Sequence, residues 1–459
     1  MAQKNVLDFF EEILNIPRSS GKEEKIAGYL VHFAQKNHLE YYADKYSNVI
    51  IKKKGTLPYK CEPIILQAHT DMVCASDEEY DFDNKGIDWY IEDGYYKAKG
   101  TTLGADNGAG MAVILAILSD ISLAHPPIEA VFTSQEETTM DGAKFLNYKK
   151  IKGKRLISLD GSEEDRIEVS SAGMASITID TDIDWVEGDY PTYQITISGL
   201  LGGHSGVDIH KRRGNAIKIL AGMLSGVDDI EIVEISGGSK ENVIPSQAKC
   251  IFKTKHDLSG AINAAKIQYK AEFRKLKIDF KRAKQSSKGI NKIKSKNIIN
   301  FLASIEDGVL KKNEREFPLT SSNLGVITTT EDKVVVRMSI RSSIVGFEDY
   351  YISRSEKQAK KNKLNYTLED RKPFFTFREE SPLRQLLVDT YKMIFFEKIT
   401  LEDVHAGLEG GIFAKEIDDL DMCVAGINLH DIHSVNEKAE IASIKNVYKW
   451  LTEALANME

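Results

Sequence analysis

The stretch Pro63-Ile-Ile-Leu-Gln-Ala-His-Thr-Asp71 joins a short apolar run to a mostly polar end that carries His69 and Asp71. Such a run is typical of a buried strand, whose polar end then lies at the edge of a sheet. His69 and Asp71 are two residues apart, so both side chains point the same way on an extended strand. Neutral imidazole is a common zinc ligand, and a nearby carboxylate can orient it. An isolated histidine here would more often be held by ordinary hydrogen bonds, so a metal site needs support from the rest of the chain.

Further apolar runs also end in acidic residues. Ile128–Ser134 leads into Glu136 and Glu137, and Arg155–Leu159 leads into Asp160. Helical patterns separate these runs, and the alternation predicts an α/β domain with a central, mostly parallel sheet flanked by helices. Ligands bind beyond the carboxyl ends of the strands in such sheets. The polar residues at these ends are therefore expected to converge.

The chain has 459 residues, more than one hydrophobic core usually accommodates. Its character changes near Trp185, where polar and apolar residues begin to alternate. We predict a catalytic domain formed by residues 1–186 and 376–459, interrupted by an inserted α+β lid domain at 187–375. Within the insertion we expect a helix over Asn297–Leu310 and a hairpin over Asn323–Ser339.

The composition is that of a globular protein, with 42% apolar residues and a net charge of -8. This charge disfavours binding to nucleic acid or to an anionic membrane. We interpret the basic tract Lys266–Lys296 as the solvated face of a helix followed by a polar loop. No apolar run approaches the roughly 20 residues that cross a bilayer, and no signal sequence is evident. A cytoplasmic protein is expected, either a monomer or a homodimer.

Cysteine usage agrees with a reducing compartment. The four cysteines are widely separated and form no C-x-x-C pair. This argues against a disulfide framework and against a structural zinc module. The cysteines are Cys61, Cys74, Cys250 and Cys423.

The polar residues at strand ends form a candidate metal set. Two imidazoles and several carboxylates suit a pair of zinc ions, or the related manganese or cobalt ions. Glu136 and Glu137 would repel each other unless a cation binds one of them, while a free carboxylate can act as general base. The set is His69, Asp71, Asp106, Glu136, Glu137, Asp160 and His433.

Several motifs together resemble a known group of enzymes. His69-Thr-Asp71, Gly104-Ala-Asp-Asn-Gly108, Glu136-Glu-Thr-Thr139 and Asp160-Gly161 resemble the di-zinc exopeptidases of the aminoacylase and carboxypeptidase G superfamily. Gly199–His210 and Val404–Glu409 narrow the resemblance to the aminoacyl-histidine dipeptidases (Xaa-His dipeptidase, peptidase D), some of which cleave carnosine. The resemblance covers nearly the whole chain. One departure is Gly410, where relatives often have cysteine, and it touches no proposed ligand.

The resemblance implies a role for each residue of the metal set. One metal would be bound by His69 and Asp160, the other by Glu137 and His433, with Asp106 bridging them. Asp71 would orient His69, and Glu136 would be the general base. A cis peptide is implied between Asp106 and Asn107.

Four residues are predicted to contact substrate, and three of them, His204, Asn242 and Arg341, lie in the insertion. His204, between glycines that allow close backbone approach, would stabilise the oxyanion of its own chain's active site. Arg341 would bind a substrate carboxylate through two hydrogen bonds, although an arginine at a strand end more often forms a surface ion pair. Asn242 and Gly407 would add hydrogen bonds.

The predicted function is hydrolysis of short unblocked dipeptides, including Xaa-His dipeptides, by a di-zinc metallopeptidase. Alternatives are a related tripeptidase or aminoacylase, and a metal-dependent peptide-binding protein without catalysis. A free carboxylate at Glu136 argues against the binding protein, which needs no general base.

Overall fold

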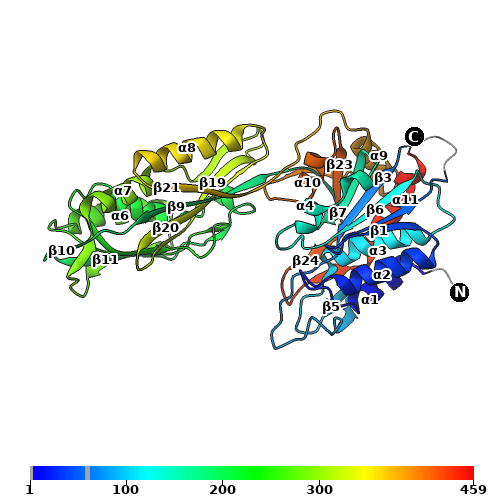
Figure 1. Cartoon of the computed structure of the whole chain (residues 1–459), viewed down its shortest axis with the longest axis horizontal. Helices are drawn as coiled ribbons and strands as arrows, with labels where there is room; N and C mark the ends of the chain where they lie inside the picture. Colours follow the sequence, from blue (N-terminus) through cyan, green and yellow to red (C-terminus); the bar gives the residue numbers. More distant parts are fainter. Residues whose placement is uncertain (1–3, 57–61, 459) are drawn as a thin grey trace. The chain divides into compact units, whose positions relative to one another are not determined.

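The computed structural model describes residues 4–56 and 62–458, so Cys61 lies outside the described residues. The chain forms two compact units (Figure 1). Unit 1 contains the described residues up to Ser171, then Phe375–Val404 and the described residues from Leu408 onward; unit 2 contains Ala172–Phe374 and His405–Gly407. The predicted insertion begins at residue 187, but the earlier strand β9 (Gly173–Asp182) pairs with two strands of unit 2.

Unit 1 is built on an eight-stranded sheet with the order β1-β2-β6-β3-β7-β23-β8-β22. Strand β3 pairs in parallel with both β6 and β7, and β7 pairs in parallel with β23. The centre of the sheet is therefore parallel, as predicted. The strands are β1 (Glu40–Ala43), β2 (Val49–Lys53), β3 (Ile64–His69), β6 (Ile128–Thr133), β7 (Arg155–Gly161), β8 (Arg166–Ser171), β22 (Thr400–Val404) and β23 (Asp421–Gly426).

Both faces of this sheet are covered. Ile64 and Leu66 of β3 pack in the larger core, whereas Ile65, between them, packs in a second core. This alternation explains why three consecutive residues at the start of the strand, Ile64, Ile65 and Leu66, are all apolar. The larger core includes residues of α1 (Val6–Leu14), α2 (Glu24–Lys36), α3 (Ala105–Ser119), α9 (Pro382–Phe395) and α11 (Ile441–Ala456). The second includes residues of α4 (Asp141–Phe145) and α10 (Gly410–Glu416).

A small four-stranded sheet completes unit 1, with the order β24-β25-β5-β4. Its strands are β4 (Trp89–Glu92), β5 (Tyr95–Ala98), β24 (Leu429–His430) and β25 (Lys438–Glu440). The loop between β24 and β25 carries His433, which is thereby anchored at both ends by the sheet.

Unit 2 is an α+β unit with an antiparallel sheet, ordered β16-β11-β15-β13-β19-β20-β9-β21, and β18 also pairs with β19. The other strands of this sheet are β11 (Thr192–Ser198), β13 (Glu231–Gly237), β15 (Ala248–Lys253), β16 (Lys277–Arg282), β18 (Gly308–Lys312), β19 (Pro318–Thr329), β20 (Lys333–Ser342) and β21 (Asn365–Lys372). The helices are α5 (Ala216–Leu224), α6 (Ser259–Glu272), α7 (Lys292–Ser304) and α8 (Phe347–Lys361). Strands β19 and β20 form the predicted hairpin.

Two sequence predictions in unit 2 were wrong in part. The helix expected over Asn297–Leu310 ends at Ser304, and Gly308–Lys312 is strand β18, paired with β19. The basic tract is not a helix and loop alone, since Lys277–Arg282 forms the edge strand β16. In β16 the buried Ile278 lies between exposed charged residues, which is a two-residue period.

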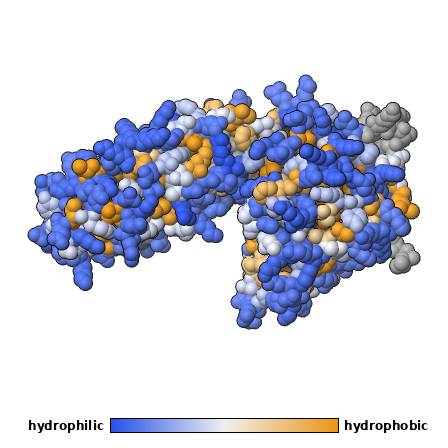
Figure 2. Space-filling model, in the orientation of Figure 1, coloured by the Kyte–Doolittle hydropathy of each residue, from blue (hydrophilic) through white to orange (hydrophobic). Residues whose placement is uncertain are grey.

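The face drawn in Figure 2 is mostly hydrophilic, with apolar side chains in scattered groups. Within the part of the chain that the structure describes, no helix has the length and apolar character needed to span a membrane. Cys74, Cys250 and Cys423 are free thiols, so none of these three is in a disulfide.

Candidate metal centre

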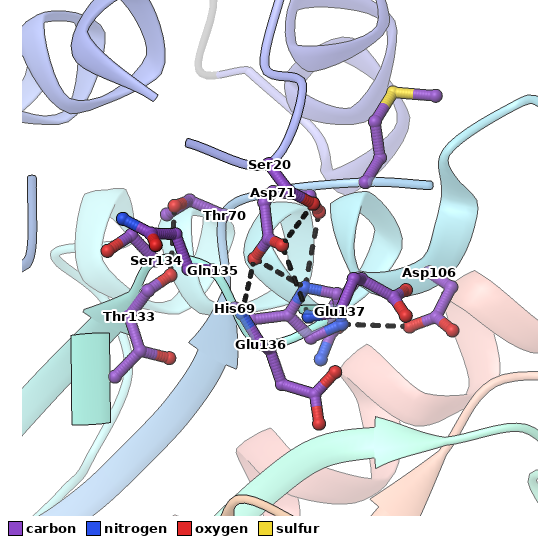
Figure 3. Close-up of polar contacts among 12 residues, drawn as sticks. Ser20, His69, Thr70, Asp71, Asp106, Thr133, Ser134, Gln135, Glu136 and Glu137 are labelled. Atoms are coloured by element: carbon purple, nitrogen blue, oxygen red, sulfur yellow. Dashed lines mark hydrogen bonds and ion pairs between the residues drawn. The ribbon is translucent and has the colours of Figure 1, made fainter. Parts of the chain in front are cut away.

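The carboxyl ends of three adjacent strands form the base of the site. β6, β3 and β7 are neighbours in the sheet, and they end near Glu136, at His69 and near Asp160. Gln135 has a φ of 57°, a left-handed turn between β6 and the two glutamates. This turn ends the two-residue alternation, so both glutamates lie near His69 (Figure 3).

The imidazole of His69 faces two carboxylates. Its Nε2 lies 3.0 Å from Oδ1 of Asp106 and 3.2 Å from Oδ1 of Asp160. The side-chain amide of Asn107 donates a hydrogen bond from Nδ2 to the same Asp160 oxygen over 2.9 Å. The peptide between Asp106 and Asn107 is cis, as the resemblance implied, and these two residues depart from helical geometry at the start of α3.

The second imidazole lies on the other side of Asp106. Nε2 of His433 is 2.8 Å from Oε1 of Glu137 and 3.4 Å from Oδ2 of Asp106. Asp106 thus presents one carboxylate oxygen to His69 and the other to His433. A carboxylate in this position is suited to contact two ions at once.

The charges of the cluster fit divalent cations. The ligand atoms form groups within 4.8 Å of one another: His69 with Asp106 and Asp160, and Asp106 with Glu137 and His433. Burial raises the pKa of Asp160 to about 6, and hydrogen bonds to Asp106 and Glu137 raise the pKa of His433 to about 10. Crowded carboxylates favour bound protons on their neighbours, and a divalent cation would offset the same excess of negative charge. Nitrogen and carboxylate oxygen donors are those that zinc, manganese and cobalt accept.

Comparison with known proteins agrees with this geometry. A family model described as "Peptidase family M20/M25/M40" matches residues 65–457, which is most of the chain. The chain belongs to peptidase family M20/M25/M40. It is therefore a peptide hydrolase, and the metal dependence of the family agrees with the ligand groups described above.

Individual M20 relatives are similar over nearly the whole chain. The cytosol non-specific dipeptidase of Escherichia coli (strain K12) is 33% identical over 466 residues, covering 98% of this chain and 96% of that protein. The aminoacylhistidine dipeptidase structure from Vibrio alginolyticus superposes with a TM-score of 0.91 at 31% identity, covering 99% of this chain and 96% of that one. The predicted resemblance to the aminoacyl-histidine dipeptidases is confirmed. A tripeptidase from Staphylococcus aureus shares the fold, with a TM-score of 0.60 at 16% identity, covering 99% of this chain and 98% of that one.

In this M20 peptidase, Asp71 connects several parts of the metal centre. Its Oδ1 lies 3.4 Å from Nδ1 of His69, the placement expected of an orienting carboxylate. The same side chain accepts hydrogen bonds from the backbone N–H groups of Glu136 and Glu137, over 3.0 and 3.2 Å, and from the hydroxyl of Ser20 over 2.7 Å. Asp71 therefore holds the glutamate loop as well as the imidazole (Figure 3), a contact that the sequence did not predict.

Glu136, the predicted general base, is half-buried, and its carboxylate lies within 4.8 Å of ligand atoms of His69 and Glu137. Burial raises the pKa of its carboxyl well above the ordinary value, and the charge of Asp160 raises it further. The Glu136 side chain accepts no hydrogen bond from any described residue that would hold it ionised. A raised pKa makes a carboxylate a stronger base, which favours the proton transfer expected of a general base.

Two further charged residues contact the loops of the metal centre, and the sequence analysis did not single them out. Arg18 follows α1, and Glu437 lies four residues after His433. Both are almost completely buried. In the sequence, only the closeness of Glu437 to His433 could have indicated a role in the metal centre. Arg18 has no such indication.

Unit 2 holds the remaining predicted residues. His204 on β12 (Gly203–His204) pairs with Val243 of β14 (Val243–Ile244), so Asn242 adjoins the same short ladder. Arg341 on β20 is 5% exposed, and its Nε has no hydrogen-bond partner among the described residues. The alternative of a surface ion pair is thus wrong for Arg341. Burial lowers its pKa to about 10, which leaves the guanidinium charged at neutral pH.

The charge of Arg341 acts on a buried histidine, His405. His405 is buried, and its Nε2 lies 2.7 Å from the hydroxyl of Ser321. Burial and then the charge of Arg341 lower the pKa of His405 to about 3, so it is neutral. Gly407, two residues later, has no atom closer than 3.8 Å to the position that a Cβ would occupy.

Proposed function

We propose that this chain is a cytoplasmic dipeptidase with two zinc ions, or manganese or cobalt ions, that hydrolyses unblocked dipeptides including Xaa-His. The observation that carries the proposal is the placement of Asp106, with one oxygen toward each of the two histidines. The relatives that match along nearly the full length are named as dipeptidases, and one of them as an aminoacylhistidine dipeptidase.

The chain's own residues would carry the proton and hold the reacting groups. When bound, the two ions would supply a water of lowered pKa and polarise the scissile carbonyl. Glu136 would accept the proton of that water and transfer it to the leaving amine. Asp71 would keep Nε2 of His69 turned toward the ligand cluster, since it faces the opposite ring nitrogen.

Unit 2 would supply substrate contacts. His204 would donate a hydrogen bond to the oxyanion, and the guanidinium of Arg341 would bind the C-terminal carboxylate of the dipeptide. The unpartnered Nε of Arg341 supports this assignment, because a buried donor without a partner is costly unless a ligand satisfies it. Asn242 and the backbone of Gly407 would add polar contacts, and unit 2 would act as the lid.

The first test is a substrate panel with metal-stripped protein, before and after addition of zinc, cobalt or manganese. The substrates are carnosine, Ala-His, Gly-Gly-Gly and an N-acetyl amino acid. We expect metal-dependent release of histidine from the dipeptides. Cleavage of only the tripeptide or only the acetylated compound would assign the chain to a tripeptidase or an aminoacylase. Two bound ions without turnover of any compound would support the peptide-binding alternative.

Arg341 is tested with Ala-His and its C-terminal amide. We expect Arg341→Lys to raise KM for Ala-His by about 10–100-fold, because a charge-assisted pair of hydrogen bonds is worth about 1.5–3 kcal/mol. The amide lacks the negative charge, so the same substitution should change its KM little. Arg337→Lys is the matched control, since Arg337 is exposed on the same strand. Equal effects on acid and amide would contradict carboxylate binding by Arg341.

A further inference from the structure

Arg18 connects two of the loops that carry metal-centre residues. Its side chain is 1% exposed, although arginine is among the residues least often buried. Nη1 donates hydrogen bonds to the carbonyl oxygens of Thr70 and Asp71, over 3.1 and 3.0 Å, and Nη2 donates to the carbonyl oxygen of Gly104. One rigid guanidinium thus joins the loop after His69 to the segment before Asp106.

Glu437 connects the same segment to the loop of His433. Its side chain is buried, and its Oε2 accepts hydrogen bonds from the N–H groups of Leu103 and Gly104 over 2.8 and 2.9 Å. Its Oε1 accepts from the N–H of Ala105 over 2.8 Å and more weakly from that of Asp106 over 3.4 Å. One carboxylate therefore fixes four consecutive backbone groups that end at the bridging residue.

The two charged groups meet at Gly104. Arg18 binds its carbonyl and Glu437 binds its N–H. Gly104 has a φ of 73°, and a Cβ there would lie 2.6 Å from Nη2 of Arg18 and 2.7 Å from Sδ of Met72. Only glycine allows this approach without displacing the guanidinium. The attraction between the two opposite charges offsets part of the free-energy cost of burying each of them. Either group left alone would be a buried charge without a partner of opposite sign.

We propose that Arg18 and Glu437 are paired positioning residues that fix the spacing of the three loops carrying His69, Asp106 and His433. This inference rests on the proposed metal centre. Neither residue is among the proposed ligands, and every hydrogen bond described above runs to backbone. The pair would therefore determine the positions of the metal ligands. Loss of the pair is expected to weaken metal binding and to increase the distance between the two ions.

The test measures metal binding by Arg18→Met, Arg18→Lys, Glu437→Gln and the double variant Arg18→Met/Glu437→Gln. Changes behind a metal's direct ligands typically cost about 10–100-fold in metal affinity, and we expect that range for Mn²⁺ with Arg18→Met. Electron paramagnetic resonance of the Mn²⁺-loaded protein reports exchange coupling between ions that share a carboxylate, and this coupling should weaken. Arg18→Lys should recover part of the affinity, because an ammonium keeps the charge but lacks the planar fork.

The double variant and a remote control separate positioning from general destabilisation. If the two residues act as a unit, the double variant should lose little more affinity than Arg18→Met alone. Trp450→Phe removes a buried hydrogen bond to the Leu387 carbonyl, between two helices without proposed ligands, and should lower thermal stability without changing Mn²⁺ coupling.

The outcomes for the metal centre and for the pair are distinct. A wild-type protein that binds none of Zn²⁺, Co²⁺ and Mn²⁺ would overturn the proposed metal centre. Wild-type protein with two coupled ions, and Arg18 and Glu437 variants with the same affinity and coupling, would overturn the positioning role alone. If Arg18→Met does not fold, Arg18→Lys and Glu437→Gln decide by the same two readouts.

Discussion

Glu136→Gln is expected to lower kcat for a dipeptide by about 10²–10⁴-fold while both metal ions remain bound. Glutamine keeps the size and shape of the side chain but cannot accept a proton. The half-buried carboxyl of Glu136, whose pKa is raised by desolvation and by Asp160, lies beside the ligand groups and is the proposed acceptor of that proton. Steady-state kinetics on Ala-His measures the loss of kcat, and metal analysis of the same samples shows whether both ions are retained.

The neighbouring residue provides a matched comparison. Glu137→Gln is the same chemical change one position later, at a side chain that lies 2.8 Å from His433. We expect it to weaken binding of one ion, and excess metal should restore much of the lost activity. If Glu136→Gln lost metal and Glu137→Gln did not, the roles of the two glutamates would have to be exchanged.

Asp106→Ala is expected to remove both ions at ordinary metal concentrations and to abolish detectable turnover. The reason is that one side chain serves both histidines, so its loss opens both sites. Metal titration followed by calorimetry measures the stoichiometry directly. Glu79→Ala, at an exposed carboxylate of unit 1, controls for loss of negative charge. Retention of one ion at wild-type affinity would show that Asp106 does not bridge.

The strand ends of the metal centre were predictable because their signals are local. An apolar run that ends at His69, or just before Glu136 or Asp160, is visible in the sequence, and parallel pairing then brings the ends together. His433 carries no comparable signal, since it follows a two-residue strand and depends on pairing within a small sheet. The sequence analysis placed it in the candidate metal set as a late polar strand end, but its pairing with Glu137 at one metal came from the family resemblance.

Contacts made to backbone groups were not predictable. Asp71, Arg18 and Glu437 bind N–H or carbonyl groups, which every residue possesses and which leave no mark in the sequence. Edge strand β16 was missed for a related reason. Its pairing with β11 joins segments far apart in the chain, and its charged residues dominate its composition.

The contacts of the buried Arg18 limit how many residues can be removed from the N-terminal side of this chain. The family model begins at residue 65, so Arg18 and the helices α1 and α2 lie outside the matched region. Yet α1 packs Phe10 and Ile13 into the larger core, and the Arg18 carbonyl accepts a hydrogen bond from the N–H of Met72 over 3.1 Å. A truncated protein that starts at the matched region would lose both part of its core and the support behind His69. The first helices are integral to the enzyme, and a fusion partner or cleavage site belongs before α1.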